Sequence, residues 1–118
     1  MSETLDQTKK LALMIGMCAR ARKIVIGCDQ VCTALPEKKA QKKVRLVLEA
    51  ADVSENTHKK LCDKCLFYNV QKEIIPLSQE ELAHAIGKKG SMVAAVAVTD
   101  EQMSRAVINL LPESQNQA

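Results

Sequence analysis

Two short segments of this chain combine glycine with polar or basic residues in a way that suits an anionic ligand. The first, residues 27–30, reads Gly-Cys-Asp-Gln and stands where a predicted strand gives way to a predicted helix. The start of a helix presents unpaired N–H groups and a partial positive charge, which suit a phosphate or a base carbonyl. The Gln30 amide can donate to and accept from a base edge, and Thr33 follows one turn later. On this segment alone, an Asp29 that merely caps the helix is the simpler interpretation.

The second segment, residues 87–91, reads Gly-Lys-Lys-Gly-Ser and joins a predicted helix to an apolar strand. The two glycines allow the backbone to approach a large ligand closely, and the two lysines favour an anionic one. The segment lacks the G-x-x-x-x-G-K-[ST] pattern of a P-loop and the G-x-G-x-x-G pattern of dinucleotide-binding folds. A turn that binds nucleic acid and a plain solvated turn both fit this pattern.

Other chemistry has little support in the sequence. His58 lies among lysines, and we expect His84 to be partly buried and hydrogen-bonded; neither belongs to a catalytic motif. The five cysteines, an odd number, are expected to stay reduced in a cytosolic chain. Four of them could hold zinc, with His58 as a fifth candidate ligand, only if two helices faced each other there. These four are Cys28, Cys32, Cys62 and Cys65. We favour the cysteines as small hydrophobic residues in a core and therefore expect no bound metal. Because no catalytic motif is present, we also expect no enzymatic activity and no cofactor.

The chain has 118 residues and a net charge of +3, but the charge is unevenly distributed. Residues 9–60 hold 12 Lys and Arg against five Asp and Glu, whereas residues 61–118 hold five against seven. Such a surplus is a plausible electrostatic footprint for phosphate, although solvated helix faces explain it as well. No apolar run reaches the length of a membrane span, and the acidic, polar N-terminus does not look like a signal peptide. We therefore expect a cytoplasmic protein.

Aromatic residues are nearly absent, since only Phe67 and Tyr68 are present. Modules that read single strands by stacking bases need aromatic platforms, so the composition argues against readers of the RRM and OB types. If this chain binds RNA, it must use backbone amides, polar side chains and shape.

Helical and strand patterns alternate along the chain, which predicts an α/β class fold: a three-layer α/β/α sandwich with four strands and five helices. We expect strands at 23–26, 44–50, 74–75 and 92–98, and helices that begin near residues 4, 28, 54, 78 and 99. Capping boxes are predicted at Ser78-x-x-Glu81 and Thr99-x-x-Gln102, and Pro36 should end the second helix. One domain should span residues 1–112, followed by a disordered tail at 113–118.

Several of these segments together resemble the kink-turn-binding ribosomal-protein family of the L7Ae and L30e type, in particular its small bacterial members. The resemblance covers about residues 5–111. It rests on stretches 22–27 (RKIVIG), 46–57 (LVLEAADVSENT), 65–70 (CLFYNV) and 81–88 (ELAHAIGK), and on the strand that leads into residues 99–100.

This resemblance implies a mixed sheet and a non-enzymatic protein that binds a kink-turn, an RNA helix bent sharply at a bulge beside sheared G·A pairs. In this family the start of the second helix enters the widened major groove at those pairs, and the loop before the last strand covers the bulged nucleotides. The implied partner is structured RNA, ribosomal RNA included, with an expected association with the ribosome or translation, no membrane contact and a monomeric state. The implied RNA-binding residues are Gly27, Asp29, Gln30 and Thr33 in the first element, Gly87, Lys88, Lys89, Gly90 and Ser91 in the second, Asp52 at their border, and Lys23 and Lys43 as nearby phosphate contacts.

The chain departs from the strongest binders of the family, which carry Asn-Glu in place of Asp29-Gln30 and a lysine in place of Thr33. Asp29 puts negative charge near phosphate, and the missing lysine removes one ionic contact, which flattens the salt slope by about 0.9. Two alternatives therefore stay open. One is a protein-interaction module that kept the fold and lost RNA binding, and the other is a thiol-based or metal-binding protein that uses the four cysteines named above.

Overall fold

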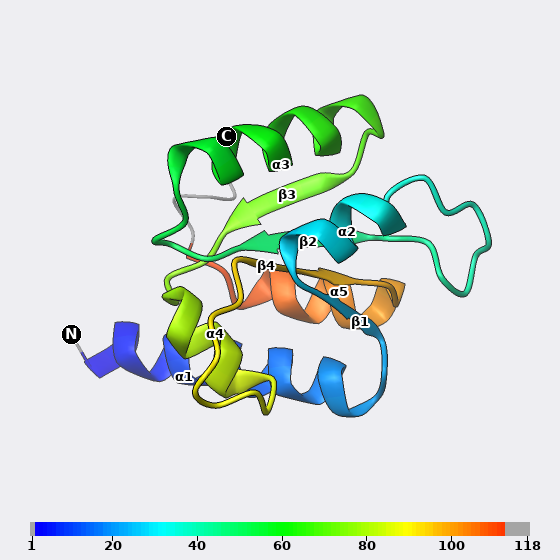
Figure 1. The fold of residues 1–118 in the computed structure, drawn as a ribbon. Coiled ribbons are helices and arrows are strands. Elements are labelled where there is room, and N and C mark those ends of the chain that lie inside the picture. The colour runs from blue at the N-terminus through cyan, green and yellow to red at the C-terminus, as the bar shows by residue number, and fades with distance from the viewer. Residues whose placement is uncertain (1, 113–118) are drawn as a thin grey trace.

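The computed structural model describes the backbone of residues 2–112, with side chains from residue 6 onward. Within this range helices and strands alternate almost without exception (Figure 1). The elements are α1 (Ser2–Arg20), β1 (Ile24–Ile26), α2 (Cys28–Ala34), β2 (Leu46–Glu49), α3 (Glu55–Phe67), β3 (Gln71–Ile74), α4 (Gln79–Ala85), β4 (Ala95–Val98) and α5 (Glu101–Asn109).

The four strands form one mixed sheet in the order β1-β4-β2-β3. β4 runs antiparallel to both β1 and β2, with Ala97 opposite Val25 on one side and Val47 on the other. β3 pairs with β2 in the parallel direction and lies at the sheet edge. β2 and β4 are buried along their whole length because both neighbours and both covering layers exclude water, which explains why they are almost entirely apolar.

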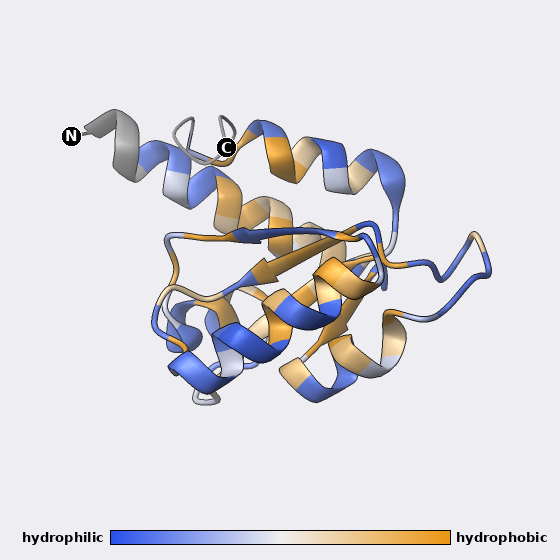
Figure 2. Ribbon diagram, turned by 90° about the horizontal axis from the view of Figure 1, so that it is seen from above, coloured by the Kyte–Doolittle hydropathy of each residue, from blue (hydrophilic) through white to orange (hydrophobic). Residues whose placement is uncertain are grey.

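Helices cover both faces of the sheet, which gives the predicted three-layer sandwich (Figures 1 and 2). One layer holds α1, α4 and α5, whose buried residues pack on Leu46, Leu48, Val96 and Val98. The other holds α2 and α3, whose buried residues pack on the opposite side of the same strands. This second core contains Val31, Leu61, Cys65, Val47, Ala95 and Ala97. The small side chains of β4 face α2 and α3 there, as the alanine-rich strand pattern predicted.

α1 and α4 approach each other very closely at one point. A Cβ atom added to Gly16 on α1 would lie 2.8 Å from the carbonyl oxygen of Ala85, the last residue of α4. That distance is too short for any side chain, so the contact requires glycine. The last turn of α4 leads directly into the turn formed by residues 87–91.

The capping boxes had different outcomes. Ser78 and Glu81 form the expected reciprocal box at the start of α4, whereas the box predicted at Thr99 and Gln102 is wrong. The N-cap of α5 is Asp100, whose side chain accepts a hydrogen bond from the Met103 N–H at 2.9 Å. The backbone N–H of Thr99 is instead used in the sheet, since it donates to the carbonyl of Lys23. The helix begins one residue later because the Thr99 N–H is still bonded to the segment that enters β1.

Two further expectations need correction. The predicted strand at 74–75 is displaced, because the parallel register that pairs Leu46 with Gln71 draws polar residues into an edge strand. His84, expected to be partly buried, is exposed. The tail predicted at 113–118 lies outside the described residues. None of the helices formed by residues 2–112 combines the length and the hydrophobicity needed to cross a bilayer.

Candidate nucleic-acid interface

The strand directions bring four connections to one end of the sheet. β1, β2 and β3 all finish at this end, and the antiparallel β4 begins there. Two backbone hydrogen bonds tie the connections together, from Gly27 N–H to Ala95 O and from Ala50 N–H to Ala94 O, each 2.8 Å long. The start of α2 and the segment that follows the lysine turn therefore lie side by side.

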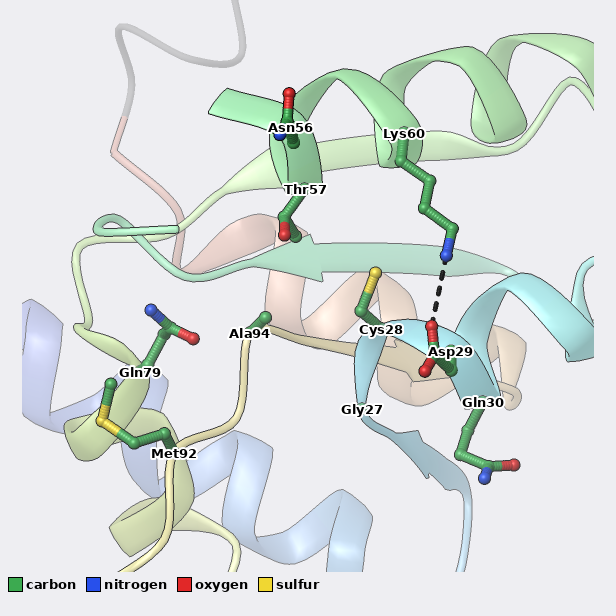
Figure 3. Close-up of a pocket in the computed structure, with 10 residues that line it drawn as sticks. All are labelled: Gly27, Cys28, Asp29, Gln30, Asn56, Thr57, Lys60, Gln79, Met92 and Ala94. Atoms are coloured by element: carbon green, nitrogen blue, oxygen red, sulfur yellow. Dashed lines mark hydrogen bonds and ion pairs between the residues drawn. The ribbon is translucent and has the colours of Figure 1, made fainter. Parts of the chain in front are cut away.

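A hollow of about 500 Å³ opens between these connections (Figure 3). Its lining comes from the start of α2, one side of α3, the start of α4 and the segment that enters β4. The lining residues are Gly27, Cys28, Asp29, Gln30, Asn56, Thr57, Lys60, Gln79, Met92 and Ala94. Its surface thus mixes hydrogen-bonding groups and one cation with small apolar patches.

The first turn of α2 has no side chain to cap it. Its N-cap is Gly27, with φ 98° and ψ 145°, a conformation that favours glycine and brings no capping oxygen. The N-caps of α3, α4 and α5 are Ser54, Ser78 and Asp100, and each accepts a hydrogen bond from its own helix. Asp29 is not the cap that the simpler interpretation assumed, since it lies inside the first turn.

Asp29 is paired with a cation across the mouth of the hollow. The Lys60 ammonium donates a hydrogen bond to Asp29 Oδ1 at 3.2 Å, which joins α3 to α2 (Figure 3). This hydrogen bond and the carboxylate charge raise the pKa of Lys60, so the lysine stays charged. Burial is the main cause that raises the pKa of the neighbouring Cys28 thiol, which therefore stays protonated near neutral pH.

Asp52 anchors the far side of the hollow instead of facing it. Its carboxylate accepts a hydrogen bond from the Gln79 N–H at 2.8 Å, and its carbonyl accepts one from the Gln79 side chain at 3.2 Å. Gln79 in turn accepts from the Val93 N–H at 3.1 Å. These bonds hold the start of α4 and the entry to β4 in fixed positions around the hollow.

The predicted turn at residues 87–91 is exposed and adjoins the hollow through Met92. Gly87 and Gly90 have φ angles of 83° and 91°, which favour glycine, and the space beside each is open. The Lys88 N–H donates to Ala83 O at 2.8 Å, which closes α4, and both lysine side chains extend from an exposed loop. The turn itself does not line the hollow.

Two of the predicted phosphate contacts lie elsewhere. Lys23 and Lys43 precede β1 and β2, so they are at the opposite end of the sheet from Gly27. Lys23 borders a separate hollow of about 280 Å³ together with Lys42. The exposed basic loop before β2 also starts from that end, so most of the charge surplus of residues 9–60 does not face the candidate interface. Thr33 borders a shallow surface beyond Asp29, next to Lys64.

Sequence reasoning missed the contribution of α3. Asn56, Thr57 and Lys60 line the hollow because β1 and β2 are both antiparallel to β4 and hence parallel to each other. Helices that follow parallel strands begin at the same sheet end. Had these two strands been assumed to be parallel, the first turns of α3 could have been predicted to lie beside α2.

The zinc arrangement considered for four cysteines is not formed by the described residues. Among residues 2–112, metal-type donors gather in a different group, Glu49, His58 and Cys62, whose ligand atoms lie within 4.8 Å of one another. Cys65 is buried, and burial is the main cause that raises its pKa to about 11. Sequence reasoning missed this group because Glu49 looked like one residue of an apolar strand.

Comparisons with known proteins agree with this architecture. A family model described as ribosomal protein L7Ae/L30e/S12e/Gadd45 family matches residues 9–108. The RNA-binding protein YlxQ of Bacillus subtilis (strain 168) is 39% identical over 98 residues, which are 83% of this chain and 91% of that protein. The RNA-binding protein YlxQ of Enterococcus faecium is 34% identical over 80 residues, which are 68% of this chain and 73% of that protein.

Solved structures share the fold. A protein of unknown function from Bacillus halodurans superposes with a TM-score of 0.74 at 33% identity, covering 86% of this chain and 95% of that chain. The Giardia lamblia 15.5kD RNA binding protein superposes with a TM-score of 0.67 at 17% identity, covering 89% of this chain and 84% of that chain. At that identity the second match concerns the fold alone.

Proposed function

Since the chain belongs to the ribosomal protein L7Ae/L30e/S12e/Gadd45 family, as its sequence resemblance indicated, we propose that it is a non-enzymatic RNA-binding protein whose target is a kink-turn or similarly bent RNA. One observation carries the proposal: the uncapped start of α2, the Lys60 side chain and the segment leaving the lysine turn meet around one hollow. The two relatives that are named RNA-binding proteins support the RNA-binding part of this proposal.

The hollow offers both kinds of contact that a bent RNA needs. The free N–H groups of the first turn of α2 and the Gln30 amide can bond to base edges or to phosphate oxygens. Lys60, Lys88 and Lys89 can pair with phosphates on the two sides of a bend. We infer that an RNA whose backbone bends at this point can contact all of these groups at once. Binding would thus favour the kinked state over the open one.

The Asp29–Lys60 pair supports RNA binding despite the acidic residue. The lysine offsets the carboxylate that would otherwise repel phosphate, and both side chains are exposed enough to separate when RNA arrives. We propose that Lys23 and Lys43 are secondary contacts. Extended chain of about 13 Å separates Lys23 from Gly27, and Lys43 lies further still from the end of β2, so only an RNA that extends along the molecule reaches both ends.

The proposal is tested by RNA affinity measured by fluorescence anisotropy. The wild-type chain is titrated with a kink-turn RNA and with the same strands carrying Watson–Crick pairs in place of the sheared G·A pairs. We expect Gln30→Ala and Lys88→Ala each to weaken kink-turn binding by about 1 kcal/mol or more, roughly fivefold, with no loss of fold by circular dichroism. Lys38→Ala is the matched control, since it removes the same charge from an exposed position at the other sheet end. With a kink-turn RNA too short to reach that end, it should leave affinity unchanged.

Equal affinity of the wild-type chain for kinked and regular duplex RNA would refute the proposal. A protein partner captured from lysate with no sensitivity to nuclease would favour the interaction-module alternative. We further propose a single domain spanning residues 1–112, a cytoplasmic location, a monomeric state and an association with ribosomal RNA or translation. Crosslinking the protein to RNA in cells and sequencing the attached RNA tests the last point and identifies the target.

A further inference from the structure

We propose that Glu49, His58 and Cys62 form a zinc-binding site between α3 and the end of β2, on the side of α3 that faces away from the hollow. Glu49 is the last residue of β2, and His58 and Cys62 lie one turn apart on α3. One carboxylate, one imidazole and one thiol are the donor types that zinc binds in proteins. This inference is independent of RNA binding.

The three donor atoms are already nearly placed for one ion. Glu49 Oε2 lies 2.7 Å from His58 Nδ1, and Cys62 Sγ lies 3.9 Å from the same nitrogen and 3.5 Å from His58 Nε2. All the ligand atoms fall within 4.8 Å of one another. Donors around a tetrahedral zinc are separated by about 3.5 Å, given metal–ligand distances of roughly 2.0–2.3 Å. To complete the geometry, the Glu49–His58 pair would open and the Cys62 thiol would move from beside Nε2 toward Nδ1.

Glu49 is held by a second partner that orients it toward this position. Its side chain is only 2% exposed, and its other carboxylate oxygen, Oε1, accepts a hydrogen bond from the Lys72 ammonium at 2.8 Å. Lys72 is itself 11% exposed, so the pair is fixed in a largely dry environment. Metal-binding carboxylates commonly carry such an outer hydrogen bond, which fixes the orientation of the ligating oxygen. Lys72 leaves Oε2 as the oxygen available to the ion.

The site also has a route to solvent and an open coordination position. The His58 side chain is 44% exposed, so an ion can enter along the imidazole edge. Three protein ligands leave the fourth tetrahedral position to water or an outside ligand. On binding, Cys62 loses its thiol proton to solvent, and His58 carries its remaining proton on Nε2 so that Nδ1 faces the ion.

The site is separate from the candidate RNA interface. Asn56, Thr57 and Lys60 line the hollow beside α2, whereas His58 contacts Glu49 on β2 and Cys62 lies against His58. The two groups therefore occupy different sides of the same helix. A substitution at Cys62 can remove the metal without touching a residue that lines the hollow.

The test is titration of the purified, reduced chain with Co²⁺ and then Zn²⁺, with Mg²⁺ as the negative ion. We expect Co²⁺ to give a thiolate charge-transfer band and tetrahedral visible bands, which one equivalent of Zn²⁺ removes, while Mg²⁺ has no effect. Cys62→Ser and, separately, His58→Gln should each weaken Zn²⁺ binding by at least about tenfold. The matched control is the double variant Cys28→Ser/Cys32→Ser, which removes two thiols from α2 and should bind Zn²⁺ as the wild-type chain does.

Two results would overturn the proposal. One is the absence of a cobalt–thiolate band in the folded wild-type chain. The other is a band that survives Cys62→Ser and disappears in Cys28→Ser/Cys32→Ser, which would place the metal on α2. Circular dichroism of each variant shows whether a lost band reflects lost ligands. His58→Gln, a change at a half-exposed side chain, provides the answer if Cys62→Ser does not fold.

Discussion

At the mouth of the hollow, one ion pair sets how much positive charge an approaching anion meets. Asp29 and Lys60 are close enough to cancel, so the lysine is only partly available to phosphate. Asp29 was recognisable from the sequence because it stands beside Gln30 in a segment that resembles known RNA binders. Lys60 was not, since 31 positions separate it from its partner and only the packing of α3 against α2 joins them.

Replacing Asp29 with Asn should strengthen RNA binding. The change removes a negative charge and releases Lys60 for a phosphate contact, which steepens the dependence of log affinity on log salt concentration by roughly 0.7–0.9. The free energy of unfolding should change little because the pair is exposed to solvent. Affinity measured over a series of KCl concentrations checks this prediction. An unchanged slope would mean that Lys60 does not meet phosphate in the complex.

At the scale of elements, the sequence predicted most helices and strands because periodicity and capping are local. Ser78 and Glu81 form their box within four residues, so nothing distant can displace it. The start of α5 was misplaced since Thr99 is still engaged in the sheet through Lys23, a contact that no local pattern reveals. β3 was displaced for the same reason, because its limits are fixed by pairing with β2.

The corrected cap of α5 gives a test with an internal control. Asp100→Ala should lower the free energy of unfolding by about 1 kcal/mol, because the Met103 N–H loses its acceptor and a carboxylate leaves the start of the helix. Thr99→Ala should cost clearly less, since the Thr99 backbone bond to the sheet remains. Urea denaturation of both variants measures the two changes. A larger loss of unfolding free energy for Thr99→Ala than for Asp100→Ala would favour the capping box predicted at Thr99 and Gln102.

For the whole molecule, the alternation of helix and strand and the buried character of β2 and β4 were sufficient to predict the sandwich. Composition alone was misleading about the binding surface. The lysines of the loop before β2 dominate the charge surplus, yet the strand directions place that loop at the sheet end opposite Gly27. Charge can be counted along a chain, but its position in space depends on topology.

Burial in the two cores should make the fold sensitive to alkali. Burial is the main cause that raises the pKa of the Cys18 and Cys65 thiols, each from 9.0 to about 11. The Asp100 carboxylate makes a smaller contribution at Cys18. Between these values the unfolded chain releases thiol protons that the folded chain keeps, so stability is intact below about pH 9 and falls as the pH rises toward about 11. Each thiol contributes up to roughly 3 kcal/mol to this loss.

Urea denaturation at about pH 8 and about pH 10.5 tests this expectation. The Cys65→Ala variant should lose less stability between the two pH values than the wild-type chain does. Cys18→Ala, which removes the other buried thiol of raised pKa, should lose less stability than the wild-type chain as well. Because lysine titration is common to all three proteins, it cancels in the comparison. Parallel curves for Cys65→Ala and the wild-type chain would contradict the assignment.

The contact between Gly16 and the carbonyl of Ala85 links the outer helical layer to the lysine turn. Any larger residue at position 16 would clash with the backbone of Ala85, which cannot move aside as a flexible side chain can. The whole of α4 would therefore have to shift, and residues 87–91 would shift with it. The position of that turn relative to the sheet consequently depends on residue 16, which no ligand would contact. A screen for altered RNA preference that varies only ligand-facing positions would overlook position 16, although substitutions there can displace the lysine turn.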